Sequence, residues 1–168
     1  KAFHWRDESV QWTDLSGEVF RVEQAHWPPK LPKASLAAAV QVMSLLAGVD
    51  PDAIPQLKNL SLLGRMTQVM VGEVSVYLDV AHNPHAATHL ARRLREAETQ
   101  TFRAVVGMNA DKDTRGVLGA LAPLVSDWFL AAADESRALA PDQLRLALPD
   151  SAQDKAKICV GISAALAK

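Results

Sequence analysis

The chain has 168 residues, of which 49% are hydrophobic, and its net charge is -1. That length suits one globular domain, or one domain and part of another, with enough apolar residues for a core. A charge so close to zero gives no electrostatic basis for binding nucleic acid or an acidic membrane surface, and no run of residues approaches the roughly 20 apolar residues of a membrane span. The single cysteine, Cys159, excludes an internal disulfide and suits a reducing compartment such as the cytoplasm.

The N-terminal part of the sequence predicts short strands followed by a helix. Aromatic and β-branched residues between turn residues indicate strands at 2–5, 10–12 and 18–22. From Pro32 to Gly48 apolar residues recur at helical spacing, and Asp50 is placed to cap a further helix or turn.

The chain starts without an initiator methionine or the apolar region of a signal peptide, so we expect it to be a piece of a longer protein. We expect a domain boundary between residues 48 and 62 and divide the chain into 1–48 and 49–168.

The remaining sequence alternates strands with helices. Two strands, 66–71 and 74–80, are separated by Gly72-Glu73 and predict an antiparallel hairpin. Later strands are predicted at 101–108, 127–132 and 157–160, and helices at 83–97, 113–125 and 141–148. Strands and helices of this length in alternation predict an α/β fold whose parallel sheet is covered by helices on both faces.

The stretch from Asp79 to Pro84 joins a strand to a helix. The nearly continuous apolar run before Asp79 predicts burial on both faces of that strand, and Asn83 followed by Pro84 predicts a capped helix start. Asp79 and His82 are then expected at the carboxyl end of a strand beside a helix N-terminus, where parallel sheets bind ligands that are often anionic. The residues alone leave open whether this is a nucleotide or phosphate site, or only a strand end and a helix cap. The cost of burying an unpaired carboxylate favours the site.

Three histidines, His82, His85 and His89, have spacings that could align them on a helix as zinc ligands. They lie away from the apolar stripe and next to Arg93 and Arg95, whose charge would repel a cation. We therefore expect no metal site in this chain.

Other polar segments lie in predicted loops. Arg65 offers a forked guanidinium suited to phosphate, or is an ordinary surface side chain. Asp111, Lys112 and Asp113 follow a predicted buried strand and either position a charged substrate or form a solvated ion pair, with Asp113 capping the next helix in both cases. The loop at 135–138 has the same two interpretations. The sequence contains neither G-x-x-x-x-G-K-[ST] nor G-x-G-x-x-G, so most contacts to the phosphates of a bound ATP would come from elsewhere.

The segment Asp79-Val-Ala-His82-Asn83-Pro84 resembles a specific family motif. Together with Gly64-Arg65 before it, and Gly107-Met and Asp111-Lys-Asp113 after it, the segment is similar to the C-terminal domain of bacterial folylpolyglutamate synthase / dihydrofolate synthase, in the Mur ligase superfamily. The resemblance covers about residues 30–168. It implies a Rossmann-like, mostly parallel C-terminal domain in 49–168, cut short at its end, preceded by a remnant of the central ATPase domain in 1–48.

The resemblance implies an ATP-dependent carboxylate–amine ligase. ATP would phosphorylate a substrate carboxylate, and the amino group of L-glutamate would attack the acyl phosphate, extending dihydropteroate or the γ-linked tail of a folate. ATP and Mg²⁺ would be the cofactors, with the phosphate loop and the magnesium ligands outside this chain. The isolated chain would hold no catalytic residue and would be inactive, and the whole enzyme would be a cytoplasmic monomer.

The resemblance also assigns roles to individual residues. It implies that Asp79 holds the ATP ribose, that Arg65 contacts phosphate and that His82 lies beside the nucleotide. The residues implied to organise or line the cleft between domains are Asn83, Asp111, Lys112 and Asp113.

Two positions depart from the family pattern. Leu63 stands where the family often has the proline of Pro-Gly-Arg, and Ser35 stands where it often has an asparagine that contacts ATP. Three alternatives stay open: a peptidoglycan precursor ligase of the same mechanism, a histidine-rich metal-dependent hydrolase, and a non-catalytic interaction module.

Overall fold

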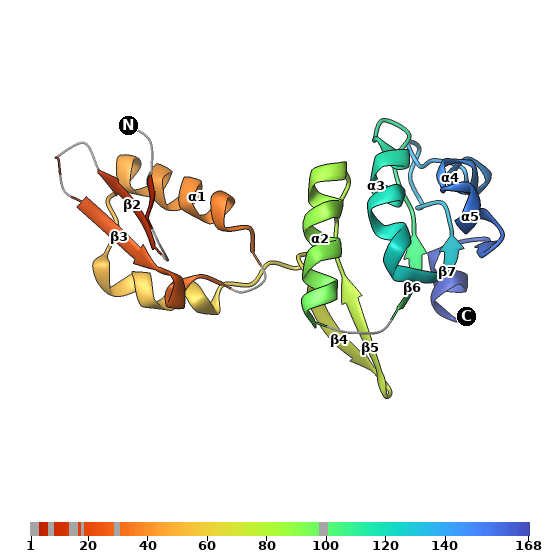
Figure 1. The fold of residues 1–168 in the computed structure, drawn as a ribbon, viewed down its shortest axis with the longest axis horizontal. Coiled ribbons are helices and arrows are strands. Elements are labelled where there is room, and N and C mark those ends of the chain that lie inside the picture. The colour runs from red at the N-terminus through yellow and green to blue at the C-terminus, as the bar shows by residue number, and fades with distance from the viewer. Residues whose placement is uncertain (1–3, 7–8, 14–16, 18, 29–30, 98–100) are drawn as a thin grey trace. The chain divides into compact units, whose positions relative to one another are not determined.

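The computed structural model describes residues 4–6, 9–13, 17, 19–28, 31–97 and 101–168. The chain divides into two compact units, Lys1–Asp79 and Val80–Lys168, and Figure 1 labels many of their helices and strands. The first residues of the strands predicted at 2–5 and 18–22 lie outside the described part. Within that part, no helix combines the length and hydropathy needed to cross a membrane.

The first unit begins with an antiparallel sheet. Its strands are β1 (His4–Arg6), β2 (Ser9–Thr13) and β3 (Val19–Glu23), in that order. Val10 pairs with Val22, and both are buried on the inner face of the sheet. A 3₁₀ turn, η1 (Gln24–His26), leads to α1 (Lys33–Leu46), which buries Leu36, Ala37 and Val40 at helical spacing against this face.

A second 3₁₀ segment, η2 (Pro51–Asn59), also packs in this core through Ile54. The Asp52 N–H donates to Asp50 Oδ1 at 2.9 Å, so the predicted cap at Asp50 is confirmed. Packing thus joins residues just beyond 48 to the first unit. The compact units divide after Asp79, by their internal contacts. The predicted domain division into 1–48 and 49–168 stays a prediction.

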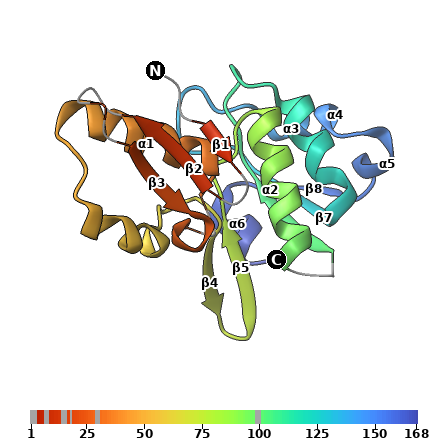
Figure 2. The ribbon, with the colours of Figure 1, turned by 60° about the vertical axis from the view of Figure 1, so that its left-hand side comes forward.

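The predicted hairpin is confirmed: β4 (Thr67–Val71) and β5 (Val74–Leu78) lie side by side (Figure 2) and pair antiparallel, with Val71 opposite Val74. Gly72 connects the strands with φ +61°, a conformation that glycine adopts at little cost.

The predicted burial of this strand is wrong. The side chains of Val74 and Leu78 are 63% and 41% exposed. Among the described residues, β4 and β5 form a two-stranded sheet of their own, separate from the parallel sheet. β-Branched residues favour a strand on any pleated surface, and the apolar run did not reveal which sheet the strand joins. Asp79 therefore does not follow a strand of the parallel sheet.

The second unit holds a parallel sheet in the order β6 (Phe102–Val106), β7 (Val125–Leu130), β8 (Ala156–Ile158). The helices of this unit are α2 (Pro84–Ala97), α3 (Thr114–Leu121), the 3₁₀ turn η3 (Ala122–Leu124), α4 (Pro141–Ala147), α5 (Asp150–Gln153) and α6 (Ile162–Leu166).

Helices cover both faces of this sheet, as predicted. Trp128 and Leu130 point to the face where α3 and α4 supply Leu118 and Leu144. The intervening Phe129 points to the opposite face, where the short α6 packs. The alternation along β7 thus gives the sheet two apolar faces. The structure confirms the predicted α/β class.

Candidate functional site

Arg65 lies in a tight turn that is fastened to Asp79. The Arg65 N–H donates to the Leu62 carbonyl at 3.1 Å, and Gly64 has φ +72°, which is the geometry of a type II turn. The next residue, Met66, is buried and has φ +49°, and its N–H donates to Asp79 Oδ2 at 2.8 Å. The Asp79 carboxylate therefore holds the backbone directly after Arg65.

The Arg65 guanidinium is available to a ligand. The residue is half-buried, and within the described part of the chain its side chain makes no hydrogen bond or ion pair. A left-handed conformation at a non-glycine residue such as Met66 costs about 1–3 kcal/mol, and such strain is concentrated at functional sites. This turn is therefore suited to present a permanent positive charge to an anion.

His82 and Asn83 precede α2 in the second unit. Asn83 Oδ1 accepts the Ala86 N–H at 2.9 Å, which confirms the predicted cap. His82 is exposed, and its Nδ1 lies 3.0 Å from the Val80 carbonyl oxygen. Because a carbonyl only accepts, Nδ1 carries a proton in this contact.

The loop from Asp111 to Asp113 precedes α3. Asp113 Oδ1 accepts the Gly116 N–H at 2.9 Å, so this predicted cap is also confirmed. Lys112 Nζ lies 2.8 Å from Asp111 Oδ2. This hydrogen bond, together with the charges of Lys112 and Arg137, lowers the pKa of the exposed Asp111 carboxyl below its ordinary value.

The loops that follow β6 and β7 are joined by backbone hydrogen bonds. The Ala110 N–H donates to the Arg137 carbonyl at 2.9 Å, the Leu139 N–H donates to the Met108 carbonyl at 2.8 Å, and Asn109 pairs with Ala138. This pairing adds Arg137 to the charged groups around Asp111. The sequence identified the 135–138 loop, which contains Arg137, as a possible substrate-positioning segment, but its pairing with residues 108–110 is non-local and was not predicted. The one available signal was that both loops follow parallel strands and so share the carboxyl edge of the sheet.

The first turns of α2 and α3 touch at Pro84 and Gly116, and Figure 1 shows the two helices side by side. A Cβ atom on Gly116 would lie 2.5 Å from Pro84 Cγ. The contact brings the His82–Asn83 segment to the Asp111–Asp113 loop. The predicted site residues therefore form two groups, Arg65 with Asp79 in the first unit and the other five in the second.

The described residues do not support the zinc hypothesis. They include no group of three or more His, Cys, Asp or Glu side chains that could hold a metal ion. The His82 ring contacts a backbone carbonyl, and His89 Nδ1 lies 3.2 Å from Arg92 Nη2.

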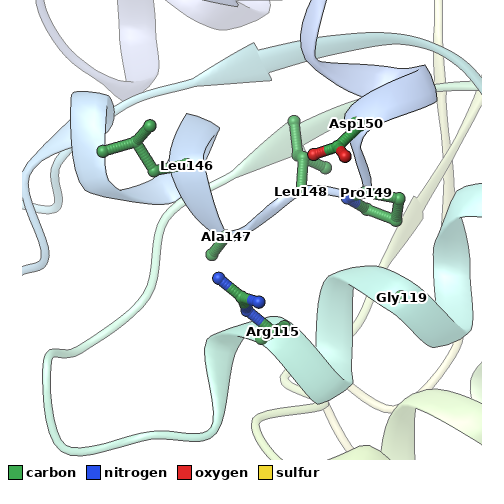
Figure 3. A pocket seen from close by; sticks show the side chains of 7 residues that line it. All are labelled: Arg115, Gly119, Leu146, Ala147, Leu148, Pro149 and Asp150. Atoms are coloured by element: carbon green, nitrogen blue, oxygen red, sulfur yellow. The ribbon is translucent and has the colours of Figure 1, made fainter.

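A shallow cavity of about 310 Å³ lies elsewhere in the second unit, beside α3 (Figure 3). Arg115 and Gly119 line one side, and residues 146–150 line the other. None of the predicted site residues lines it, so the cavity is separate from the candidate site.

Known proteins similar to this chain are ligases. A family model described as "Mur ligase, glutamate ligase domain" matches residues 64–168. The dihydrofolate synthase/folylpolyglutamate synthase of Escherichia coli (strain K12) is 32% identical over 118 residues, which is 69% of this chain and 28% of that protein. The UDP-N-acetylmuramoyl-L-alanyl-D-glutamate--2,6-diaminopimelate ligase of Aquifex aeolicus (strain VF5) is 28% identical over 129 residues, 75% of this chain and 27% of that protein.

A solved structure agrees in fold. The bifunctional folylpolyglutamate synthase/dihydrofolate synthase from Yersinia pestis, complexed with AMPPNP and Mn ion, is 32% identical and has a TM-score of 0.75. It covers 95% of this chain, which spans 36% of that chain. This chain thus spans about a third or less of the proteins it matches. The similarity confirms the predicted resemblance, and because the family model matches more than half of its residues, the chain belongs to the Mur ligase family.

Proposed function

We propose that this chain supplies part of the nucleotide site of an ATP-dependent ligase that adds L-glutamate to dihydropteroate and to folates. The observation that carries the proposal is the turn at Arg65, held by Asp79 at the start of the Asp-Val-Ala-His-Asn-Pro motif. The sequence similarity to the E. coli and Yersinia enzymes supports the folate substrates, and the AMPPNP in the Yersinia structure supports ATP.

The geometry fits a nucleotide at each proposed contact. The guanidinium of Arg65, which has no ion pair among the described residues, suits a phosphate. A carboxylate offers about four acceptor positions, so the bond from Met66 to Asp79 is compatible with ribose hydroxyls as further donors. His82, within the motif, is exposed, and only its Nδ1 lies against the Val80 carbonyl among the described residues. Asn83 is proposed to organise the loop, and the 111–113 loop to line the interdomain cleft.

These residues bind and orient, and we assign no catalytic residue to this chain. When the substrate carboxylate attacks the terminal phosphorus of ATP and ADP leaves, charge develops on the phosphoryl oxygens. A positively charged donor held in place before the reaction stabilises that charge. Arg65 is proposed for this task.

A divalent cation bound with the nucleotide would neutralise phosphate charge. The Mn ion in the Yersinia structure supports such a metal, and we propose Mg²⁺ for this enzyme. Since the described residues hold no cluster suited to a cation, we assign no metal ligand in this chain. The single cysteine supports a reducing compartment, and we propose a cytoplasmic, monomeric enzyme.

The test is an assay of the full-length enzyme for ATP-dependent phosphate release. With glutamate present, we expect release with dihydropteroate or folate as acceptor, and none from the isolated chain. The Aquifex relative favours a second candidate, a ligase of peptidoglycan precursors. Activity only with a UDP-linked muramoyl peptide and diaminopimelate would establish that candidate instead.

Variants of the full-length enzyme test the residues. Arg65→Ala is expected to lower kcat/KM by about 100-fold, as loss of a charge-stabilising donor does. Arg95→Ala, an exposed arginine on α2, is the matched control and should be near wild type. The bond from Met66 makes Asp79→Asn a better variant than Asp79→Ala, since the amide oxygen still accepts the Met66 N–H while the second carboxylate oxygen is replaced by a donor. Wild-type rates in Arg65→Ala and Asp79→Asn would contradict the assignment.

A further inference from the structure

Gly116 occupies a position in α3 that leaves no room for a side chain. A Cβ atom there would lie 2.5 Å from Pro84 Cγ and 2.7 Å from Asp113 Oδ2, closer than real contacts allow. A Cβ on Gly119, in the same helix, would meet nothing within 4 Å. Glycine in a helix costs about 1 kcal/mol relative to alanine, so a glycine at 116 needs a local reason. The close approach of α2 provides that reason.

The two groups that crowd Gly116 belong to the two helix caps. Pro84 directly follows Asn83, whose side chain caps α2. Asp113 caps α3 by accepting the N–H of Gly116 itself. The ring of Pro84 cannot rotate away from an added methyl group, and Asp113 could move only by weakening its cap.

The contact therefore fixes two loops relative to each other. His82 lies two residues before Pro84, and Asp111 and Lys112 directly precede Asp113. A Cβ atom at 116 would force Pro84 Cγ from 2.5 Å to an ordinary contact distance of at least 3.4 Å, a shift of about 1 Å between these segments.

We infer that Gly116 is a positioning residue of the proposed nucleotide site, which seats the His82–Pro84 segment against the Asp111–Asp113 loop. The inference rests on the proposed function of these two segments. Gly116 touches no substrate. It acts through Pro84 and Asp113, and a misplacement of this size is enough to weaken ligand binding and catalysis.

The first experiment measures the packing in the chain itself. Gly116→Ala is expected to shift the backbone amide NMR signals of both segments, 82–86 and 111–116. Gly119→Ala should shift only signals of its own helical turns. If Gly116→Ala leaves the signals of residues 82–86 unchanged, the two loops are not coupled through this residue and the inference is overturned.

The second experiment measures the affinity of the full-length enzyme for AMPPNP by calorimetry, at a temperature where each variant is folded by circular dichroism. Gly116→Ala is expected to weaken binding by about fivefold or more. The double variant Pro84→Ala/Gly116→Ala removes the ring that the new methyl group would meet, and should recover more than half of the lost affinity relative to Pro84→Ala alone. Val117→Ala, a buried neighbour in α3, controls for general destabilisation and should bind normally.

The outcomes separate the two proposals. Equal weakening by Gly116→Ala and Val117→Ala would show a general loss of stability and overturn the positioning role. Normal affinity in Gly116→Ala, despite shifted NMR signals, would overturn it as well. Failure of the wild-type enzyme to bind AMPPNP would instead overturn the proposed function, and with it the nucleotide as the ligand that Gly116 serves.

Discussion

The carboxylate of Asp79 holds the Met66 amide in a backbone conformation that few residues other than glycine adopt. From the sequence, Asp79 could be a ligand residue or only the end of a strand. The structure gives it a structural task, fastening the turn that contains Arg65. Its contact to a ribose is a separate proposal. If the same carboxylate holds both the Met66 amide and a ribose, nucleotide binding and the conformation of the Arg65 turn depend on each other.

The turn at Arg65 leads to a prediction about stability. Leu63 occupies the second position of this type II turn, before Gly64, and is 87% exposed. Proline suits that position, and its rigidity lowers the entropy of the unfolded chain. Leu63→Pro is therefore expected to raise the free energy of unfolding by about 0.4–1 kcal/mol, measured by urea denaturation.

Gly64→Ala is the matched control for that variant. Because Gly64 has φ +72°, alanine there should lower the stability by about 1–2 kcal/mol. If Leu63→Pro destabilises the chain, or Gly64→Ala does not, the turn differs from the one described.

Asp111 gives a prediction about pH. Its pKa is lowered chiefly by the hydrogen bond from Lys112, and a group with a lowered pKa in the folded state contributes stability above its unfolded-state pKa. That contribution is lost as the pH falls through the folded-state pKa. Lys112→Met should raise the pKa of Asp111 towards its ordinary value, measured by carboxyl ¹³C NMR titration. Arg137→Met should raise the pKa less, because the charge of Arg137 is a weaker cause, and an unchanged pKa in Lys112→Met would refute the ion pair.

At the scale of elements, the hairpin shows where sequence patterns succeed and fail. Gly72-Glu73 between two β-branched runs identified β4 and β5 because turn chemistry is local. The pattern did not show that one face would consist of Val69, Val71, Val74, Val76 and Leu78, most of it exposed. Burial depends on which other elements pack there, and apolar content does not encode that choice.

Paired substitutions test the exposure of the hairpin. Val74→Thr, at a side chain that is 63% exposed, should change the free energy of unfolding by no more than about 0.5 kcal/mol. Val22→Thr places the same hydroxyl where the side chain is 1% exposed, and should cost about 1–3 kcal/mol. Equal costs, measured by chemical denaturation, would show that the hairpin face is covered in solution.

Helix boundaries were predictable to within a few residues, since caps depend on neighbouring residues. Asp50, Asn83 and Asp113 each accept a backbone N–H at the predicted helix start. The close contact of Gly116 with Pro84 could not be predicted, because the two residues are 32 positions apart (116 − 84) and the contact requires α2 and α3 to pack together. The left-handed Met66 was unpredictable for a similar reason, since Asp79, 13 residues later in the sequence, stabilises it across the open end of the hairpin.

At the scale of the whole molecule, the chain contains separate sets of core residues. The core of the first unit combines β2, β3, α1 and η2, whereas the cores of the second unit lie on the two faces of its parallel sheet. The alternation of strands and helices in the sequence predicted the parallel sheet with a core on each face. The strands of the first unit were predictable from composition, but the inclusion of η2 through Ile54 was not, because a single apolar side chain decides it.

Two leucine substitutions test whether these cores are separate in stability as well as in composition. Leu36 in α1 is 7% exposed, and Leu144 in α4 is fully buried. Truncation of a buried leucine to alanine costs about 2–5 kcal/mol. Leu36→Ala is expected to raise amide hydrogen exchange mainly in β2, β3 and α1, and Leu144→Ala mainly in α3, α4 and β7, because among the described residues each leucine packs within its own core. Mass spectrometry of peptides from both units measures this. If either substitution raised exchange equally throughout the chain, the two units would unfold as one cooperative body.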